Sequence, residues 1–323
     1  MQSKIPSTMK AVTIDAFGGI ENLKVRDIPT PSAGPGEVLI RFEYAGVGVW
    51  DPYETGGYFH EKFGGPAKFP LGVGSEGSGT VAAVGEGVSD FKEGDKVYAI
   101  TLMNGKGTAF SEYAAVKTAM VSPVPKGLTM EGAAVAPIDA LTALSGLETL
   151  KVQKGDSIAI FGAAGGLGHL AVQLAKRLGA KVLAVASGDD GVGLAKQLGA
   201  DAVVNGRQDD LAAAAKAFAP GGLDAVLLSA GGGAAAPLVN GLKPGGRVAH
   251  PTGVQNAPKP PHGIAMQVYD GETTQAAIGR VNKLIEAGPF TVHIAQTWPL
   301  EKIVEAEKAL ETHYLGKMAV KVG

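Results

Sequence analysis

Glycine residues crowd together near the middle of the chain. The stretch FGAAGGLG, residues 161–168, contains four glycines in eight positions. The spacing is close to a G-x-G-x-x-G dinucleotide fingerprint, with Ala163 at the first glycine position. Glycines in this pattern permit a tight turn, the approach of a pyrophosphate to the backbone, and close packing of helix on strand. We therefore predict a dinucleotide site, rather than a structural turn alone, at Gly162, Ala163, Gly165, Gly166, Leu167 and Gly168.

The segments around these glycines predict the elements that position them. SIAIF, residues 157–161, is an apolar run typical of a buried strand, and LAVQLAKRLGA repeats apolar residues at helical spacing. The N-terminus of that helix offers free N–H groups and the positive end of a dipole to a phosphate. Strand and helix patterns go on alternating from about residue 129 to residue 250. This rhythm predicts a parallel sheet with helices on both faces.

The first 125 residues have a different texture, with short β-runs separated by proline- and glycine-rich turns. We therefore expect two domains. The doubly wound domain is expected at residues 126–264, and the second domain at residues 1–125 together with residues 265–323. The segment YFHEKFGGPAKFP, residues 58–70, is expected to form a lid or rim, and its aromatic residues either wall a pocket or pack in the ordinary way.

Composition excludes several classes of protein. The 323 residues are 45% hydrophobic and 19% charged with a net charge of −2, as in a globular protein without a field that recruits nucleic acid or anionic membrane. The start lacks the apolar run of a signal peptide, and no stretch of about 18 apolar residues appears. We therefore expect no nucleic-acid or membrane partner, and a cytoplasmic location.

Metal chemistry is not expected from the residue types. There is no cysteine, and the six histidines show neither an H-E-x-x-H motif nor i,i+4 pairing. Without a Lewis acid, a simple ketone or alcohol is difficult to polarise, whereas quinones and α,β-unsaturated carbonyl compounds accept a hydride more readily because the charge spreads onto an oxygen. An electron-poor acceptor is therefore expected.

Several segments recur in a fixed order along nearly the whole chain. They are GVGVWDPYETGGY, PLGVGSEGSGTVAAVGEGV, EYAAV, AAVAPIDALTAL, the glycine motif and the closing HYLGKMAVKV. In these segments the chain resembles the zinc-independent quinone oxidoreductase (zeta-crystallin-like) branch of the medium-chain dehydrogenase/reductase superfamily. The resemblance implies an α/β fold, with a Rossmann doubly wound parallel sheet plus a GroES-like β-barrel domain. Where zinc-dependent relatives carry ligands, this chain has Gly48 and Ser75, with Glu76 left alone.

The resemblance also implies roles for single residues. Tyr53, two residues after Asp51, matches the substrate side of the nicotinamide and is the expected hydrogen-bond donor, unless its ring merely packs. Asp51 is expected to hold the loop rather than to transfer protons. Thr142 matches a position beside the nicotinamide, although a helix cap is the equal alternative. Lys317 matches the closing glycine–lysine motif of the family and is expected near the cofactor.

Cofactor preference is predicted from the end of the second strand of the doubly wound domain. NAD enzymes usually place an acid there to bind the ribose 2′-hydroxyl, but the chain has Ala186 and then Ser187. Arg207 either contacts a 2′-phosphate or is solvated. The missing acid favours NADPH, with NADH as the alternative.

The expected function follows from these inferences. It is NADPH-dependent, metal-free hydride transfer to a quinone or another electron-poor conjugated carbonyl compound. The alternatives are an enoyl or 2-alkenal reductase that reduces a carbon–carbon double bond, and a nicotinamide-binding protein without turnover. An open sheet edge favours a homodimer, or a tetramer of paired dimers.

Overall fold

The chain forms two compact units in the computed structural model, which describes residues 5–64 and 67–323. The N-terminal unit comprises residues 1–138 and 294–323, and the central unit comprises residues 139–293. Residues 1–4, at the start of the segment in which no signal peptide is expected, lie outside the described residues. So do residues 65–66 of the expected lid. No described helix is long and apolar enough to span a membrane.

Both predicted domain boundaries need correction. Residues 265–293, expected in the first domain, belong to the central unit because β14 (Met266–Tyr269) extends its parallel sheet and α9 (Gln275–Glu286) packs on α5 (Gly166–Arg177). Residues 126–138 belong to the N-terminal unit because α3 (Met130–Val135) packs on four of its strands. Long-range sheet pairing and helix packing set these boundaries, and neither leaves a local sequence signal.

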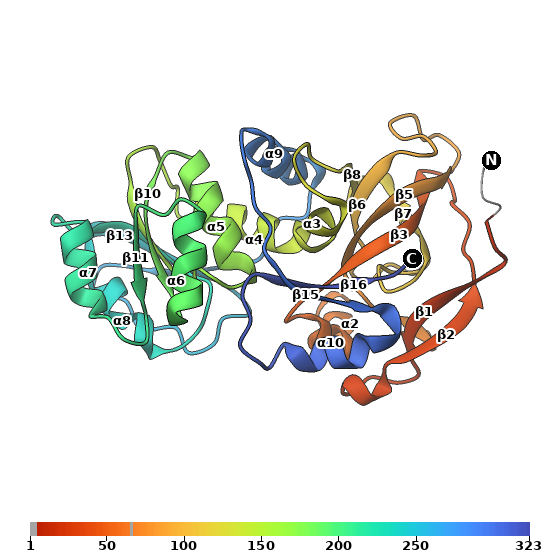
Figure 1. The fold of residues 1–323 in the computed structure, drawn as a ribbon, viewed down its shortest axis with the longest axis horizontal. Helices are drawn as coiled ribbons and strands as arrows, with labels where there is room; N and C mark the ends of the chain where they lie inside the picture. Colours follow the sequence, from red (N-terminus) through yellow and green to blue (C-terminus); the bar gives the residue numbers. More distant parts are fainter. Residues whose placement is uncertain (1–4, 65–66) are drawn as a thin grey trace. The chain divides into compact units, whose positions relative to one another are not determined.

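The N-terminal unit is built from two sheets (Figure 1). One has the strand order β15-β16-β3-β5-β6-β8, with β7 also paired to β3, and the other has the order β2-β1-β4. Four short α-helices accompany them among the described residues. The strands are β1 (Thr8–Ile14), β2 (Lys24–Pro29), β3 (Glu37–Val47), β4 (Leu71–Gly72), β5 (Glu76–Val84), β6 (Lys96–Ile100), β7 (Tyr113–Lys117), β8 (Val121–Pro123), β15 (Ile294–Pro299) and β16 (Lys317–Lys321); the helices are α1 (Asp51–Thr55), α2 (Tyr58–Phe63), α3 and α10 (Ile303–Ala309).

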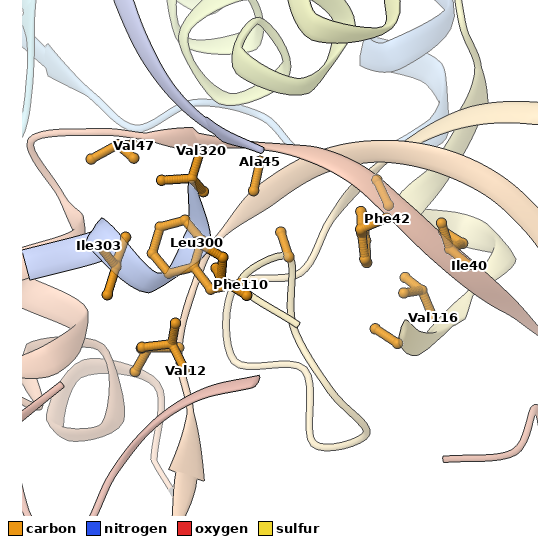
Figure 2. Packing of buried hydrophobic residues seen from close by; sticks show 14 of the residues in the cluster. Val12, Ile40, Phe42, Ala45, Val47, Phe110, Val116, Leu300, Ile303 and Val320 are labelled. Carbon is orange, nitrogen blue, oxygen red and sulfur yellow. The ribbon is translucent and has the colours of Figure 1, made fainter. Parts of the chain in front are cut away.

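The core of this unit joins segments from both ends of the chain. Phe42 on β3 and Phe110 in the loop before β7 are fully buried, and Figure 2 shows them with Val12, Ile303 and Val320. Burying an aromatic or branched side chain of this size contributes roughly 1.5–3 kcal/mol. The last 30 residues are therefore part of the core of the N-terminal unit.

The central unit is a parallel six-stranded sheet of order β11-β10-β9-β12-β13-β14 (Figure 1). This is the doubly wound order with a switch point beside β9. Consecutive residues of β9, β10 and β12 are buried, as expected when both faces of a sheet are covered. The predicted alternation of strand and helix is confirmed. The elements are β9 (Ser157–Phe161), β10 (Lys181–Ala186), β11 (Ala202–Asn205), β12 (Leu223–Leu228), β13 (Leu242–Pro251) and β14, with α4 (Pro137–Thr149), α5, α6 (Gly188–Gln197), α7 (Leu211–Phe218), α8 (Ala236–Asn240) and α9.

Candidate functional site

The glycine motif forms the turn between β9 and α5. Gly162 has φ of 83°, a left-handed conformation that favours glycine. Gly165 is the N-cap of α5 in extended backbone. A Cβ on Gly168 would lie 2.1 Å from the carbonyl oxygen of Gly162, so a side chain there would push the turn apart. Two of the three glycines are therefore required by the backbone geometry itself.

Neighbouring strands hold this turn in place. The N–H groups of Gly162 and Ala163 both donate to the carbonyl oxygen of Val185 on β10, at 3.0 and 2.9 Å. From the end of β12, the Ser229 hydroxyl donates to the carbonyl oxygen of Phe161 at 2.7 Å and lies 3.2 Å from that of Gly162. The turn is thus fixed before any ligand arrives.

The start of α5 fits the pyrophosphate of a dinucleotide. The first-turn N–H groups of a helix have no acceptor further back in the helix, and this first turn contains no acidic residue. Within the predicted set, the residues Gly162, Gly165, Gly166 and Leu167 are partly exposed. Ala163 and Gly168 are buried, which indicates that they serve the packing of the turn rather than direct contact.

Ser187 and Arg207 lie at the same edge of the sheet. β10 pairs in parallel with β9 and with β11, so the carboxyl ends of the three strands are neighbours. Ser187 is the N-cap of α6, and its side chain makes no capping hydrogen bond. Arg207 is exposed just beyond β11, and its backbone N–H donates to Asn205 at 3.1 Å. The end of β10 carries Ala186, where NAD enzymes usually have an acid for the ribose. Asp189 and Asp190 follow in the first turn of α6.

Thr142 is not a helix cap, because it lies inside α4. Its hydroxyl packs closely against Gly271 just after β14, where a Cβ would lie 2.5 Å from Oγ1. The capping alternative for Thr142 is therefore excluded, and the expected position beside the nicotinamide stays a prediction.

Asp51 and Tyr53 are on α1 in the N-terminal unit, but their surroundings differ. Asp51 is 2% exposed, and its Oδ2 accepts from the backbone N–H of Gly48 at 2.8 Å. Tyr53 is 53% exposed, with its ring edge-to-face against Tyr58 at 6.0 Å. The carboxylate holds the loop while the phenol faces outward, so the tyrosine is the residue that can meet a ligand.

Trp50 explains why residue 48 is a glycine. A Cβ on Gly48 would lie 2.4 Å from the Trp50 ring, so the indole occupies the space that a side chain would need. The ammonium group of Lys317 lies 4.4 Å from the centre of the same ring and 3.2 Å from Glu76 Oε1. Within the described part of the chain, no group of three or more His, Cys, Asp or Glu residues is arranged to hold a metal ion.

Lys317 was expected to be a cofactor contact. In the structure its charge is engaged inside the N-terminal unit, with the side chain 3% exposed against a fully buried Glu76. The two residues meet because β16 and β5 pair with opposite edges of β3. A contact with the cofactor would have to be made from this buried ion pair.

Sequence reasoning missed the buried acids beside Asp51. Glu54 and Glu307 are each 2% exposed. Burial raises the pKa of Glu54 to about 7, and burial together with the Glu54 charge raises the pKa of Glu307 to about 8. Burial and the charges of Glu307 and Glu54 also raise the pKa of Asp51 well above its usual range. The i,i+3 spacing of Asp51 and Glu54 in the sequence indicates that the two acids share a helix face. No local pattern indicates that Glu307 is buried near them.

The aromatic residues of the expected rim are more exposed than ordinary packing predicts. Tyr58, Phe63 and Phe69 are 42%, 62% and 42% exposed. Edge-to-face contact joins Tyr58 to Phe59, whose ring stacks on Phe63. This surface is continuous with Tyr53 through the Tyr53–Tyr58 contact.

Two family models match different parts of the chain. The alcohol dehydrogenase GroES-like domain matches residues 34–126, and the zinc-binding dehydrogenase model matches residues 166–279. Human quinone oxidoreductase is 34% identical over 180 residues, which are 55% of this chain and 53% of that protein. Alcohol dehydrogenase 1 of Emericella nidulans is 34% identical over 56% of this chain and 57% of its own length. The chain thus spans little more than half the length of these curated relatives.

Solved structures match over nearly the full chain. The quinone oxidoreductase from Coxiella burnetii is 27% identical with a TM-score of 0.81, covering 98% of this chain and 100% of that one. Mycobacterial Rv1454c complexed with NADPH is 27% identical with a TM-score of 0.79, covering 97% and 99%. An NAD-dependent alcohol dehydrogenase is 28% identical with a TM-score of 0.84, covering 98% and 100%.

Proposed function

Since this chain belongs to the medium-chain dehydrogenase/reductase superfamily and is quinone oxidoreductase-like, we propose that it is an oxidoreductase that uses NADPH to reduce a quinone or another electron-poor conjugated carbonyl compound. The observation that carries the proposal is the turn between β9 and α5. Its glycine geometry and acid-free helix start suit a pyrophosphate at the switch point of the sheet.

The residues that would hold the dinucleotide lie at the carboxyl ends of three neighbouring strands. The backbone at Gly165, Gly166 and Leu167 would bind the pyrophosphate, and Ser187 and Arg207 would lie toward the adenosine ribose. The strand end has no acid for a 2′-hydroxyl, which supports NADPH. Against this, Asp189 and Asp190 place negative charge nearby, so the margin over NADH is expected to be moderate.

A bound nicotinamide supplies the hydride, and the protein must then stabilise the charge that develops on the acceptor oxygen. We assign this task to the Tyr53 hydroxyl, a hydrogen-bond donor exposed on α1. Asp51 fixes the start of the same helix through Gly48. Because the zinc-ligand positions carry Gly48 and Ser75, an acceptor that needs no Lewis acid fits this chain best.

The test is a panel of quinones, enones, simple ketones and primary alcohols, assayed with NADPH and with NADH, with identification of products. We expect a higher kcat/KM with NADPH and turnover confined to quinones and enones. Products reduced at a carbon–carbon double bond, with quinones inert, would establish the alkene reductase instead. Binding of NADPH without oxidation by any acceptor would contradict an enzymatic role.

A further inference from the structure

Four buried carboxyl groups in the N-terminal unit interact electrostatically with one another. Asp51 and Glu54 come from α1, Glu76 from the start of β5, and Glu307 from α10, and none is more than 2% exposed. Lys317 on β16 is a buried cation that pairs with Glu76. Within residues 5–64 and 67–323, the other three acids form no ion pair.

The Ser75 hydroxyl lies between two of these acids. Its Oγ is 3.3 Å from Asp51 Oδ1 and 3.2 Å from Glu54 Oε2. A serine hydroxyl carries one proton and donates to one acceptor at a time. Two ionised carboxylates would therefore compete for the single Ser75 proton, whereas a proton on one of the two acids would supply the second donor. The geometry thus suits one proton held by the pair.

Glu307 gives independent evidence that this region favours neutral carboxyl groups over ionised ones. Neither of its carboxylate oxygens has a hydrogen-bond partner among the residues that the structure describes. An ionised carboxylate buried in this way is costly, whereas a neutral acid is tolerated. The charges of Glu307 and Glu54 also raise the pKa of Asp51, so an ionised form of any of these acids makes ionisation of Asp51 more costly.

We propose that Asp51 and Glu54 bind one shared proton through the Ser75 hydroxyl, and that this proton holds α1 in position. In one arrangement the Glu54 carboxyl donates to Ser75 Oγ, whose hydroxyl donates to Asp51; in the other, both donors are reversed. Removing the proton leaves two buried carboxylates competing for a single donor. When the first arrangement changes to the second, the Glu54 proton passes to Ser75 Oγ and the Ser75 proton passes to Asp51. One O–H bond forms for each that breaks, so the number of protons on the three side chains is unchanged.

The shared proton matters to α1 because both acids lie on this helix and accept hydrogen bonds from backbone outside it. Its N-cap residue, Trp50, makes no side-chain capping bond. Asp51 Oδ2 accepts from the Gly48 N–H at 2.8 Å, and Glu54 Oε2 accepts from the Gly74 N–H at 2.9 Å. The pair thereby ties α1 both to the end of β3 and to the turn before β5. Because Tyr53 lies on α1, the shared proton also positions the Tyr53 hydroxyl. That role rests on the proposed function, but the binding of the proton does not.

Folding must take up this proton, so the stability of the protein reports it. Between about pH 5 and pH 7 the unfolded carboxyl groups are ionised while the folded pair keeps one proton. Unfolding then releases a proton, and the unfolding equilibrium constant should rise tenfold per pH unit from this site alone. Glu54→Gln places a permanent amide donor beside Ser75 and should remove this contribution, making the variant comparatively more stable at the upper end of the range.

The experiment is urea unfolding at several pH values for the parent, Glu54→Gln, Asp51→Asn and the double variant. Glu61→Gln, an exposed acid on α2, is the matched control. Glu307 is also neutral when folded and should keep its own contribution to the slope in every variant. Relative to the parent, each single variant and the double variant should lose the same tenfold-per-unit component, because one proton is shared by two residues. A parent slope retained in full in Glu54→Gln and in Asp51→Asn, or losses that add in the double variant, would overturn the sharing of one proton.

Hydrogen exchange separates positioning from simple stability. Protection factors of the α1 amides should fall above pH 7 in the parent and stay level in Glu54→Gln. Unchanged protection of α1 across that range in the parent would overturn the positioning role. Neither measurement needs turnover. A protein that is inactive with every acceptor would contradict the proposed function, and the binding of the shared proton would still be tested by unfolding and hydrogen exchange.

Discussion

Tyr53 is the residue on which the proposed chemistry depends most directly. Its phenol is exposed on α1, whereas the neighbouring Asp51 is committed to the loop. Tyr53→Phe removes the hydrogen-bond donor and keeps the ring, so kcat should fall by about 10²-fold, the smaller end of losses for an oxyanion donor, with NADPH affinity unchanged. Enones should be affected more than strongly electron-poor quinones, which need less help with charge.

Tyr58→Phe is the matched control for that prediction. Tyr58 is also exposed and its ring touches that of Tyr53, but it begins α2 rather than lying on α1. Its hydroxyl has no assigned part in the reaction, so kcat should stay near the parent value. Equal activity of Tyr53→Phe and the parent on both acceptor types would remove the donor role and leave positioning of the hydride as the mechanism.

Helix α5 shows how one element makes a ligand site through close packing. At Gly168 a Cβ would lie 2.1 Å from the carbonyl oxygen of Gly162, a backbone atom that cannot rotate away. Gly168→Ala should therefore open the turn, weaken NADPH binding at least tenfold and cost about 1–3 kcal/mol of stability, the usual range for overpacking. Calorimetric titration and urea unfolding measure the two effects.

Gly279→Ala in α9 provides the control, because a Cβ there meets nothing within 4 Å. Alanine is a better helix former than glycine, so this variant should gain up to about 1 kcal/mol and bind NADPH as the parent does. If Gly168→Ala matched Gly279→Ala in both measurements, the turn would be more adaptable than its geometry indicates.

At the scale of the whole molecule, the open edge of the central sheet calls for a partner. β14 is the last strand of that sheet, and Val268 on it is 59% exposed. Unpaired edge strands are usually covered or paired, and we propose that two copies of this chain pair through β14 in a homodimer. Light scattering should then give about twice the 32.7 kDa chain mass, or four times if dimers associate.

Val268→Asp tests which surface is responsible. A carboxylate at this edge should shift the protein toward the monomer, because two copies related by a two-fold axis would bring like charges together. Val84→Asp, on an exposed position of the N-terminal unit, should leave the mass unchanged. A parent mass near 32.7 kDa at micromolar concentration would count against the dimer itself.

Local pattern determined the central unit well. The alternation of apolar runs and amphipathic segments predicted β9, α5, β10 and the strands up to β13 but not β14, and the glycine spacing predicted the turn. These features are visible in sequence because each arises within a window of about ten to twenty residues. Hydrophobic periodicity and the backbone freedom of glycine act at that range.

Tertiary structure alone decided which distant side chains meet. The family segments singled out Asp51, Ser75, Glu76 and Lys317 in the sequence. They did not predict that Lys317 pairs with Glu76, or that Ser75 contacts two acids. Lys317 meets Glu76 because β3 lies between β16 and β5, and Ser75 meets the two acids because the turn before β5 is bonded to α1. Helix α10 adds the Glu307 charge from the end of the chain. Strand order and long-range packing have no local period, so only the folded chain brings these charges together and buries them.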